Sequence, residues 1–189
     1  MRGSSSLTSV FSAMSFQIVP YESAHREGII AVVQDVHREY GFSWDEAGYH
    51  RDLYEIERTY LEPGGMFWTL RNAERIVGGV GVTLHDKAHP AHDPQGSAPI
   101  ERAPELKYAE LHRLYLLKEC RGQGWGRRMM QLTIDYATSH GCTRMIAWSD
   151  FVLADAHALY RKAGFVQEGW RICDDPDQSR EHGFWKEPL

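Results

Sequence analysis

The chain has 189 residues, of which 42% are hydrophobic and 12% aromatic, and its formal net charge is −5. These values indicate one globular domain with its own core and argue against a disordered chain. They also argue against nonspecific binding of nucleic acid, which calls for a positive surface. No apolar run approaches the roughly 20 residues that cross a membrane, so we expect no membrane partner.

The cysteines and the first residues of the chain both suit a cytoplasmic protein. The three cysteines, Cys120, Cys142 and Cys173, are odd in number and have no paired spacing, which suits a reducing compartment. Residues 1–14 are rich in serine and too weakly apolar for a signal peptide, so we expect a disordered leader or a cloning remnant. Residues 15–189 are predicted to form a single domain.

The first half of that domain predicts a strand, two helices and a hairpin. The strand covers residues 16–20, and a helix with Ser23 as its N-cap follows and ends at Gly41. Apolar residues at helical spacing predict a second helix over residues 44–61. Two apolar runs around a short polar turn then predict a hairpin over residues 66–84.

The second half predicts alternating strands and helices after a long surface loop over residues 85–106. The expected elements are a strand at 109–116, a helix ending near His140, a strand at 144–148, a helix at 154–163, a strand at 165–173 and a final edge strand at 182–186. Strands that alternate with helices predict an α/β fold around one mixed sheet.

A glycine-rich turn joins the strand at 109–116 to the helix that follows it. Its sequence is Arg-Gly-Gln-Gly-Trp-Gly-Arg-Arg, from Arg121 to Arg128. Alternate glycines let successive N–H groups point into one small space at the positive end of a helix dipole. Together with the flanking arginines, this arrangement predicts a phosphate or pyrophosphate site. The spacing fits neither a Walker A loop nor a Rossmann fingerprint.

The turn resembles the Arg/Gln-x-x-Gly-x-Gly/Ala signature of the GNAT (Gcn5-related N-acetyltransferase) superfamily, with Arg121, Gly124 and Gly126 at its defining positions. A second segment, from Ala156 to Phe165, is similar to the family's Ala-x-x-Leu-Tyr-x-x-x-Gly-Phe motif. The resemblance implies a mixed, mostly antiparallel sheet of about seven strands flanked by helices. It also implies that acetyl-CoA is bound by the strand and the turn, at Leu114, Tyr115, Leu116, Arg121, Gly122, Gln123, Gly124, Trp125, Gly126 and Arg127.

The same resemblance implies the catalytic residues. Tyr160 is the predicted acid, because a hydroxyl near the coenzyme sulfur can protonate the departing thiolate. Many relatives carry an Asn slightly upstream, where this chain has Leu153, which departs from the family pattern. Glu110 resembles a Glu found on this strand in some members and is the predicted base, with His112 in reserve. The alternative for Glu110 is a structural ion pair with Arg113 or Arg144.

Strand alternation places Glu110 on one face with His112, Leu114 and Leu116. Histidines at 85, 89 and 92 have spacings that suit a helix, but the prolines around them favour a loop, and we expect no metal site.

The predicted function is therefore acetyl-CoA-dependent N-acetyl transfer by direct attack of an amine. The acidic composition favours a small cationic amine or a peptide amine as acceptor. Two alternatives remain: a catalytically silent acyl-CoA-binding module on the same fold, and an unrelated domain whose glycine turn captures a nucleotide. A homodimer is a further possibility that the sequence leaves open.

Overall fold

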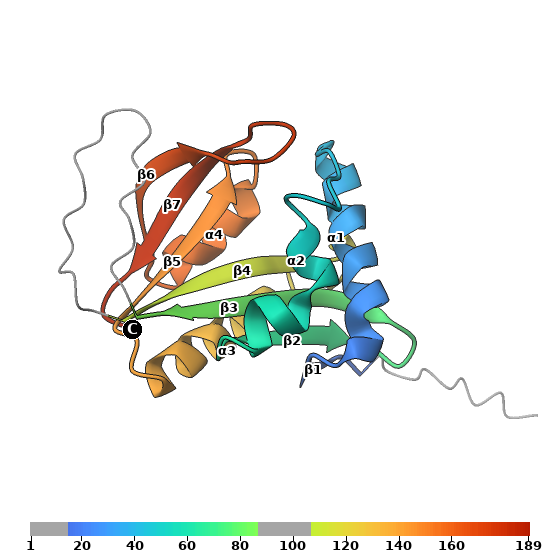
Figure 1. Cartoon of the computed structure of the whole chain (residues 1–189), viewed down its shortest axis with the longest axis horizontal. Helices are drawn as coiled ribbons and strands as arrows, with labels where there is room; N and C mark the ends of the chain where they lie inside the picture. The colour runs from blue at the N-terminus through green and yellow to red at the C-terminus, as the bar shows by residue number, and fades with distance from the viewer. Residues whose placement is uncertain (1–14, 87–106) are drawn as a thin grey trace, which may run out of the picture.

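A computed structural model describes residues 15–86 and 107–189, and its centre is one seven-stranded sheet (Figure 1). The spatial order of the strands is β1-β2-β3-β4-β5-β7-β6, and every neighbouring pair is antiparallel except β4 and β5. The strand bounds are β1 Gln17–Pro20, β2 Met66–Arg71, β3 Ile76–His85, β4 Tyr108–Leu116, β5 Arg144–Asp150, β6 Val166–Ile172 and β7 Arg180–Lys186. The predicted fold class is confirmed. The leader and most of the 85–106 loop lie outside the described residues.

Helices cover both faces of the sheet (Figure 1). Their bounds are η1 Ser23–His25, α1 Arg26–Tyr40, α2 Arg51–Tyr54, η2 Glu57–Leu61, η3 Lys118–Cys120, α3 Trp125–Ser139 and α4 Ala154–Lys162. The apolar stripe of α1 is buried from Ile29 to Val36, and the helix ends at Gly41, whose φ of 75° is left-handed. The helix α3 is amphipathic in the same way and packs against β3 and β4.

Three elements differ from the prediction. Ser23 is not a side-chain cap, because Glu22 occupies the N-cap position and η1 precedes α1. The second helix is split into α2 and η2, because Asp45 accepts hydrogen bonds from the N–H groups of Gly48 and Tyr49 and so stabilises a turn. The last strand, β7, lies inside the sheet between β5 and β6, which leaves β6 at the edge.

Glycines on β3 let the covering elements approach the sheet closely. A Cβ atom at Gly79 would collide with the Ile29 side chain of α1, and one at Gly78 would collide with Leu116. A Cβ at Gly81 would lie 2.7 Å from a ring carbon of Tyr60 in η2. Since real Cβ contacts are longer than this, α1 and η2 depend on glycine at these positions for their place on the sheet.

Candidate active site

The sheet opens between β4 and β5. The two strands pair in parallel from Tyr108 with Arg144 to Leu111 with Ala147, and the pairing ends there. Beyond this point β4 continues beside β3, while β5 continues beside β7, and Figure 1 shows the two strands diverging. The inner edges of β4 and β5 therefore carry backbone groups without a strand partner, available to an extended ligand.

A bulge interrupts β4 where the gap begins. The register with β3 pairs Gly81 with His112 but Gly79 with Tyr115, so two residues of β4 lie opposite Val80. One of them, Arg113, has a left-handed φ of 53°. The extra residue breaks strand alternation, so the predicted common face was wrong for Leu116. Leu116 points instead to α3, with Cδ1 3.5 Å from the Cβ position of Gly126.

Tyr115 takes the place on the cavity face that was predicted for Leu116. It lines the cavity described below, and its ring centroid lies 5.9 Å from that of His37 on α1. Because the predicted pantetheine contacts at 114–116 involve backbone groups, the change of face leaves that prediction untouched.

The glycine turn leaves open space at the start of α3. Gly122 and Gly124 have left-handed φ values of 73° and 85°, and no atom of the described residues lies within 4 Å of a Cβ at either position. The first helical hydrogen bond runs from Arg128 N to Gly124 O, and Gly124 provides no side-chain cap. The N–H groups of the first turn are thus free to bind an anion.

Gly126 serves packing as well. A Cβ there would lie 3.2 Å from Cδ2 of Leu159 on α4, so this glycine brings α3 and α4 together.

The arginines around the turn have different partners. Arg121 forms two hydrogen bonds to the Glu39 carboxylate, at 2.8 and 2.7 Å, and a third to the Leu116 carbonyl at 2.9 Å. The guanidinium of Arg128 lies 4.7 Å from the Trp125 ring. Arg127 is exposed and makes no ion pair within residues 15–86 and 107–189, which leaves it available to a phosphate.

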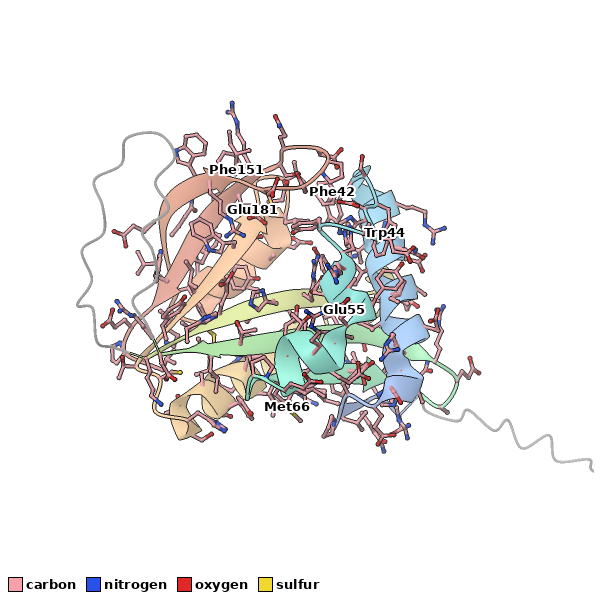
Figure 2. All side chains as sticks on the ribbon, in the orientation of Figure 1. Phe42, Trp44, Glu55, Met66, Phe151 and Glu181 are labelled. Atoms are coloured by element: carbon pink, nitrogen blue, oxygen red, sulfur yellow. The ribbon has the colours of Figure 1, made fainter. Side chains whose placement is uncertain are left out.

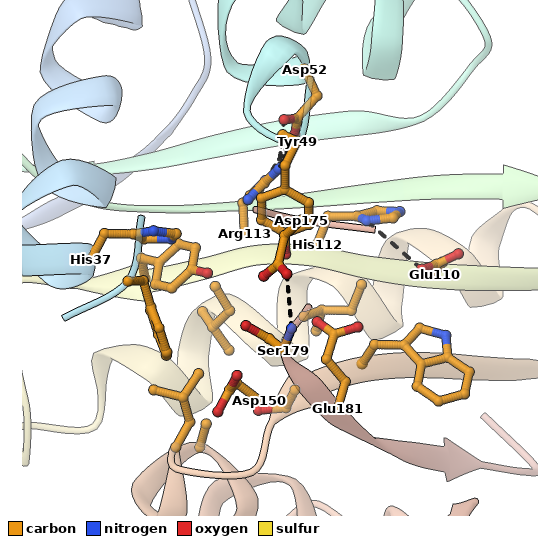
Figure 3. Close-up of a pocket in the computed structure, with 18 of the residues that line it drawn as sticks. His37, Tyr49, Asp52, Glu110, His112, Arg113, Asp150, Asp175, Ser179 and Glu181 are labelled. Atoms are coloured by element: carbon orange, nitrogen blue, oxygen red, sulfur yellow. Dashed lines mark hydrogen bonds and ion pairs between the residues drawn. The ribbon is translucent and has the colours of Figure 1, made fainter. Parts of the chain in front are cut away.

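A cavity of about 320 Å³ lies where β4, β5 and β7 meet the segment after α1 (Figure 3). It brings together Glu110, His112 and Tyr160, the three predicted proton-transfer residues, with Tyr160 entering from α4. Five carboxylates and two guanidinium groups line it, namely those of Asp52, Glu110, Asp150, Asp175, Glu181, Arg113 and Arg171.

Glu110 and His112 lie at one side of this cavity. The Glu110 carboxylate is 3.9 Å from His112 Nδ1, and His112 Nε2 is 2.9 Å from the Thr83 hydroxyl. Burial lowers the pKa of His112, so its ring is neutral at pH 7 and able to accept a proton. The alternative ion pair between Glu110 and Arg113 is not formed, because Asp52 binds the Arg113 guanidinium at 2.7 and 2.9 Å.

Tyr160 is 4% exposed. Burial raises its pKa, and the nearby Tyr115 and Glu181 add to the rise. Its hydroxyl makes no hydrogen bond to any other described residue, and it remains protonated at neutral pH. It therefore keeps its proton at neutral pH and cannot serve as the base, while the proton is available to a strongly basic thiolate.

Sequence reasoning missed three cavity carboxylates, Asp150, Asp175 and Glu181. Glu181 is buried, accepts a hydrogen bond from Arg171 Nε at 2.7 Å, and has a pKa raised by burial. The predicted final strand began one residue after Glu181, so the sequence did not predict that Glu181 pairs with Asp150 and Arg171 across neighbouring strands.

No group of His, Cys, Asp and Glu side chains in the described part of the chain is arranged to hold a metal ion. His89 and His92 lie outside that part. Within the same described ranges, none of the helices has the length and apolar character needed to cross a membrane. Cys120, Cys142 and Cys173 are free, buried thiols.

Comparison with curated proteins finds N-acetyltransferases. The chain is 28% identical over 140 residues to the uncharacterized N-acetyltransferase YjgM of Escherichia coli, covering 72% of this chain and 74% of that protein. It is 29% identical over 126 residues to N-acetyltransferase 8 of Rattus norvegicus, covering 66% of this chain. The match spans 50% of the rat protein, so the chain corresponds to about half the length of that relative.

Solved structures show the same fold. A GNAT-family acetyltransferase from Staphylococcus aureus Mu50 superposes with a TM-score of 0.70 at 18% identity, covering 92% of this chain and 99% of that one. The NatC complex bound to a Gag peptide and CoA matches with a TM-score of 0.63 at 12% identity, covering 93% and 99%. The model of the acetyltransferase (GNAT) family matches residues 29–165. This chain therefore belongs to the GNAT family of acetyltransferases.

Proposed function

We propose that the protein transfers the acetyl group of acetyl-CoA directly to an amine, either a small cationic amine or a peptide amine. The observation that carries the proposal is the continuous path along β4. It runs from the open glycine turn, past an unpaired strand edge, to a cavity that holds both a proton acceptor and a proton donor. The relatives named N-acetyltransferases and the CoA bound by the NatC complex support the same cosubstrate.

Three parts of acetyl-CoA have a counterpart along this path: the pyrophosphate, the pantetheine arm and the thioester. The pyrophosphate fits the N–H groups between Gly122 and Arg127, with the Arg127 side chain as an additional cation. The pantetheine arm fits the free edge of β4 at Leu114, Tyr115 and Leu116, where backbone groups face the gap. The thioester then reaches the bulge, where an N–H group released from pairing with β3 can stabilise the developing oxyanion.

An ammonium acceptor loses two protons on its way to the amide, and the sulfur gains one. Glu110 or His112 takes a proton from the ammonium form of the acceptor, which frees its lone pair to attack the thioester carbonyl carbon. The C–N bond forms, and the C–S bond breaks when the tetrahedral intermediate collapses. Tyr160 donates its proton to the departing thiolate. The second proton of the attacking nitrogen passes to solvent, and Tyr160 is reprotonated from solvent, so one proton is released net.

The charge of the cavity supports a cationic acceptor. Its five carboxylates exceed its two guanidinium groups, and both guanidinium groups already bind carboxylates, Arg113 to Asp52 and Arg171 to Glu181. The remaining carboxylates, of Glu110, Asp150 and Asp175, attract a positively charged amine and repel an anionic one. A cytoplasmic location and a homodimer remain predictions.

A panel of amines tests the proposal through release of free thiol from acetyl-CoA. Acceptors matched in size should show kcat/KM rising with their positive charge, and added salt should reduce the advantage by screening. Neutral or anionic amino acids as the best acceptors would contradict the charge argument. Acetyl-CoA binding without turnover on any amine would favour the silent acyl-CoA-binding module, and tighter binding of a nucleotide than of acetyl-CoA would favour a nucleotide-binding domain.

A further inference from the structure

We propose that the Asp52–Arg113 ion pair is a brace that holds the β4 bulge in the conformation that receives the thioester. Asp52 and Arg113 are then positioning residues, which act on the reaction through the backbone of β4 and do not touch the reacting atoms. The inference rests on the proposed acetyl transfer for its effect on rate, while its structural part can be measured without any acceptor.

The backbone of Arg113 is in a conformation that its residue type disfavours. Its φ of 53° lies in the left-handed region, which a long side chain rarely adopts. Gln178, in the β6–β7 loop, is the other non-glycine residue with positive φ among residues 15–86 and 107–189. Such a conformation inside a strand persists only when surrounding contacts hold it.

The side chain of Arg113 makes those contacts (Figure 3). Nε donates to Asp52 Oδ2 at 2.9 Å, and Nη2 donates to Asp52 Oδ1 at 2.7 Å and to the Tyr49 carbonyl at 2.6 Å. The guanidinium also lies 4.6 Å from the centre of the Tyr49 ring. The side chains of Arg113 and Asp52 are 9% and 17% exposed, so solvent screens this pair weakly.

The partner residues are themselves held in place. Asp52 belongs to α2 and accepts a hydrogen bond of 2.6 Å from the hydroxyl of Tyr60, which is buried in η2. The brace thus ties the split second helix to the point where β4 stops pairing regularly with β3. Without the brace, β4 is free to return to an ordinary extended backbone, which removes the N–H geometry at the bulge.

Two substitutions at Arg113 separate the backbone from the side chain. Arg113→Gly and Arg113→Ala both remove the guanidinium, but glycine adopts positive φ without steric cost and alanine does not. We expect kcat of Arg113→Ala to fall about 10²-fold, the scale of losing one oxyanion donor. Arg113→Gly should keep a kcat at least about fivefold above that of Arg113→Ala, and the acceptor KM should change by less than about threefold in both.

An equal fall of kcat/KM in Arg113→Gly and Arg113→Ala that comes mainly from a higher acceptor KM would overturn the brace, because the arginine would then bind substrate directly. Wild-type kcat in Arg113→Ala would overturn it as well.

Double variants control for the unpaired Asp52 carboxylate that each Arg113 variant leaves behind. Arg113→Ala deprives the buried Asp52 carboxylate of its partner, which can unfold a protein. The same comparison is therefore repeated in an Asp52→Asn background, where no buried charge is left unpaired. The matched control is Glu57→Gln, which removes the partner of Arg26, 2.7 Å away, in an ion pair outside the cavity lining. That variant should retain wild-type kcat.

Amide hydrogen exchange gives the readout that is independent of activity. In Arg113→Ala, peptides covering residues 112–116 should exchange faster than in the wild type, while peptides covering β2 should not change. Wild-type exchange at 112–116 in this variant would overturn the brace. A wild-type protein that acetylates no amine would refute the proposed function alone, since the exchange measurement would still decide the brace.

Discussion

The two ends of the proposed substrate path are built in opposite ways. At the coenzyme end, one continuous stretch from Gly122 to Arg127 joins the glycine turn to the first turn of α3, with open space around Gly122 and Gly124 among the described residues. At the acceptor end, the cavity is lined by side chains from α2, β4, β5, α4 and β7 and from the β6–β7 loop. Phe42 and Glu181, both labelled in Figure 2, line it although they lie far apart in the sequence. A site made of backbone is local in sequence, whereas a site made of side chains depends on strand order.

The largest effect is expected from placing charge in the glycine turn. Gly124→Glu should weaken acetyl-CoA binding by at least about 100-fold, because two like charges about 4 Å apart near a protein surface repel by about 4 kcal/mol. Gly124→Ala is the control, since it meets the same unfavourable φ of 85° without the charge, and its loss should stay below about tenfold. Calorimetric titration of acetyl-CoA measures both. Equal losses of acetyl-CoA affinity in the two variants would mean that position 124 needs glycine because of backbone strain and not because of anion binding.

At the acceptor end, the largest effect is expected at Tyr160. Tyr160→Phe should lower kcat about 10²-fold and leave the Kd of acetyl-CoA unchanged, because the hydroxyl acts only when the thiolate departs. Since burial raises the pKa of Tyr160 above its ordinary value of 10.0, the wild-type rate should show no loss from this group between about pH 6 and 9. The hydroxyl has no protein partner in the described residues, so the variant should keep its Tm. A normal kcat across this pH range would exclude Tyr160 as the acid.

A smaller effect should separate the two possible bases. Glu110→Gln is expected to lower kcat/KM about 30-fold at about pH 7.5, and His112→Gln about fivefold. A base must be deprotonated, and the pKa of His112 lies below its ordinary 6.5, so any limb that it causes rises with pH below 6.5 and is level at neutral pH. Profiles of kcat/KM against pH for both variants check this. The reverse order of losses, with the limb absent in His112→Gln, would make His112 the base.

The smallest effect concerns Arg121, whose side chain is already bound to Glu39 and to the Leu116 carbonyl. Arg121→Ala should change the Kd of acetyl-CoA by less than about fivefold and lower the stability by about 1 kcal/mol, as for a partly exposed ion pair. Glu39→Gln should cause a similar fall in Tm. A loss of affinity above about 50-fold in Arg121→Ala alone would show that the guanidinium leaves Glu39 to bind phosphate.

Sequence reasoning succeeded where local pattern and structure coincide. The hairpin of β2 and β3 and the helix carrying Tyr160 have patterns that match the structure, and the strand that enters the glycine turn was predicted close to its observed bounds but without its bulge. It failed where a few local contacts determine the backbone conformation. Asp45 turns a helical pattern into a turn, and the bulge at Arg113 moves Leu116 to the opposite face. Neither the turn nor the bulge changes the hydrophobic periodicity of the sequence.

The candidate site divides in the same way. Glu110 and Tyr160 sit in recognisable motifs, and the cavity contains both. Asp150 and Glu181 become neighbours only because β7 inserts between β5 and β6, and that order follows from packing of the whole sheet. The partner of Arg113 was also out of reach, because Asp52 lies 61 positions away.

The glycines of β3 have a consequence for how this protein can vary. Gly79 and Gly81 do not line the cavity themselves, yet they set the distance of α1 and η2 from the sheet. Those elements carry His37 and Tyr60, which form part of the cavity wall. A single methyl group added at either glycine would therefore move the wall of the cavity, so these two positions help to set the size of acceptor that the cavity admits. We expect variants selected for activity on acceptors of a different size to carry substitutions in β3.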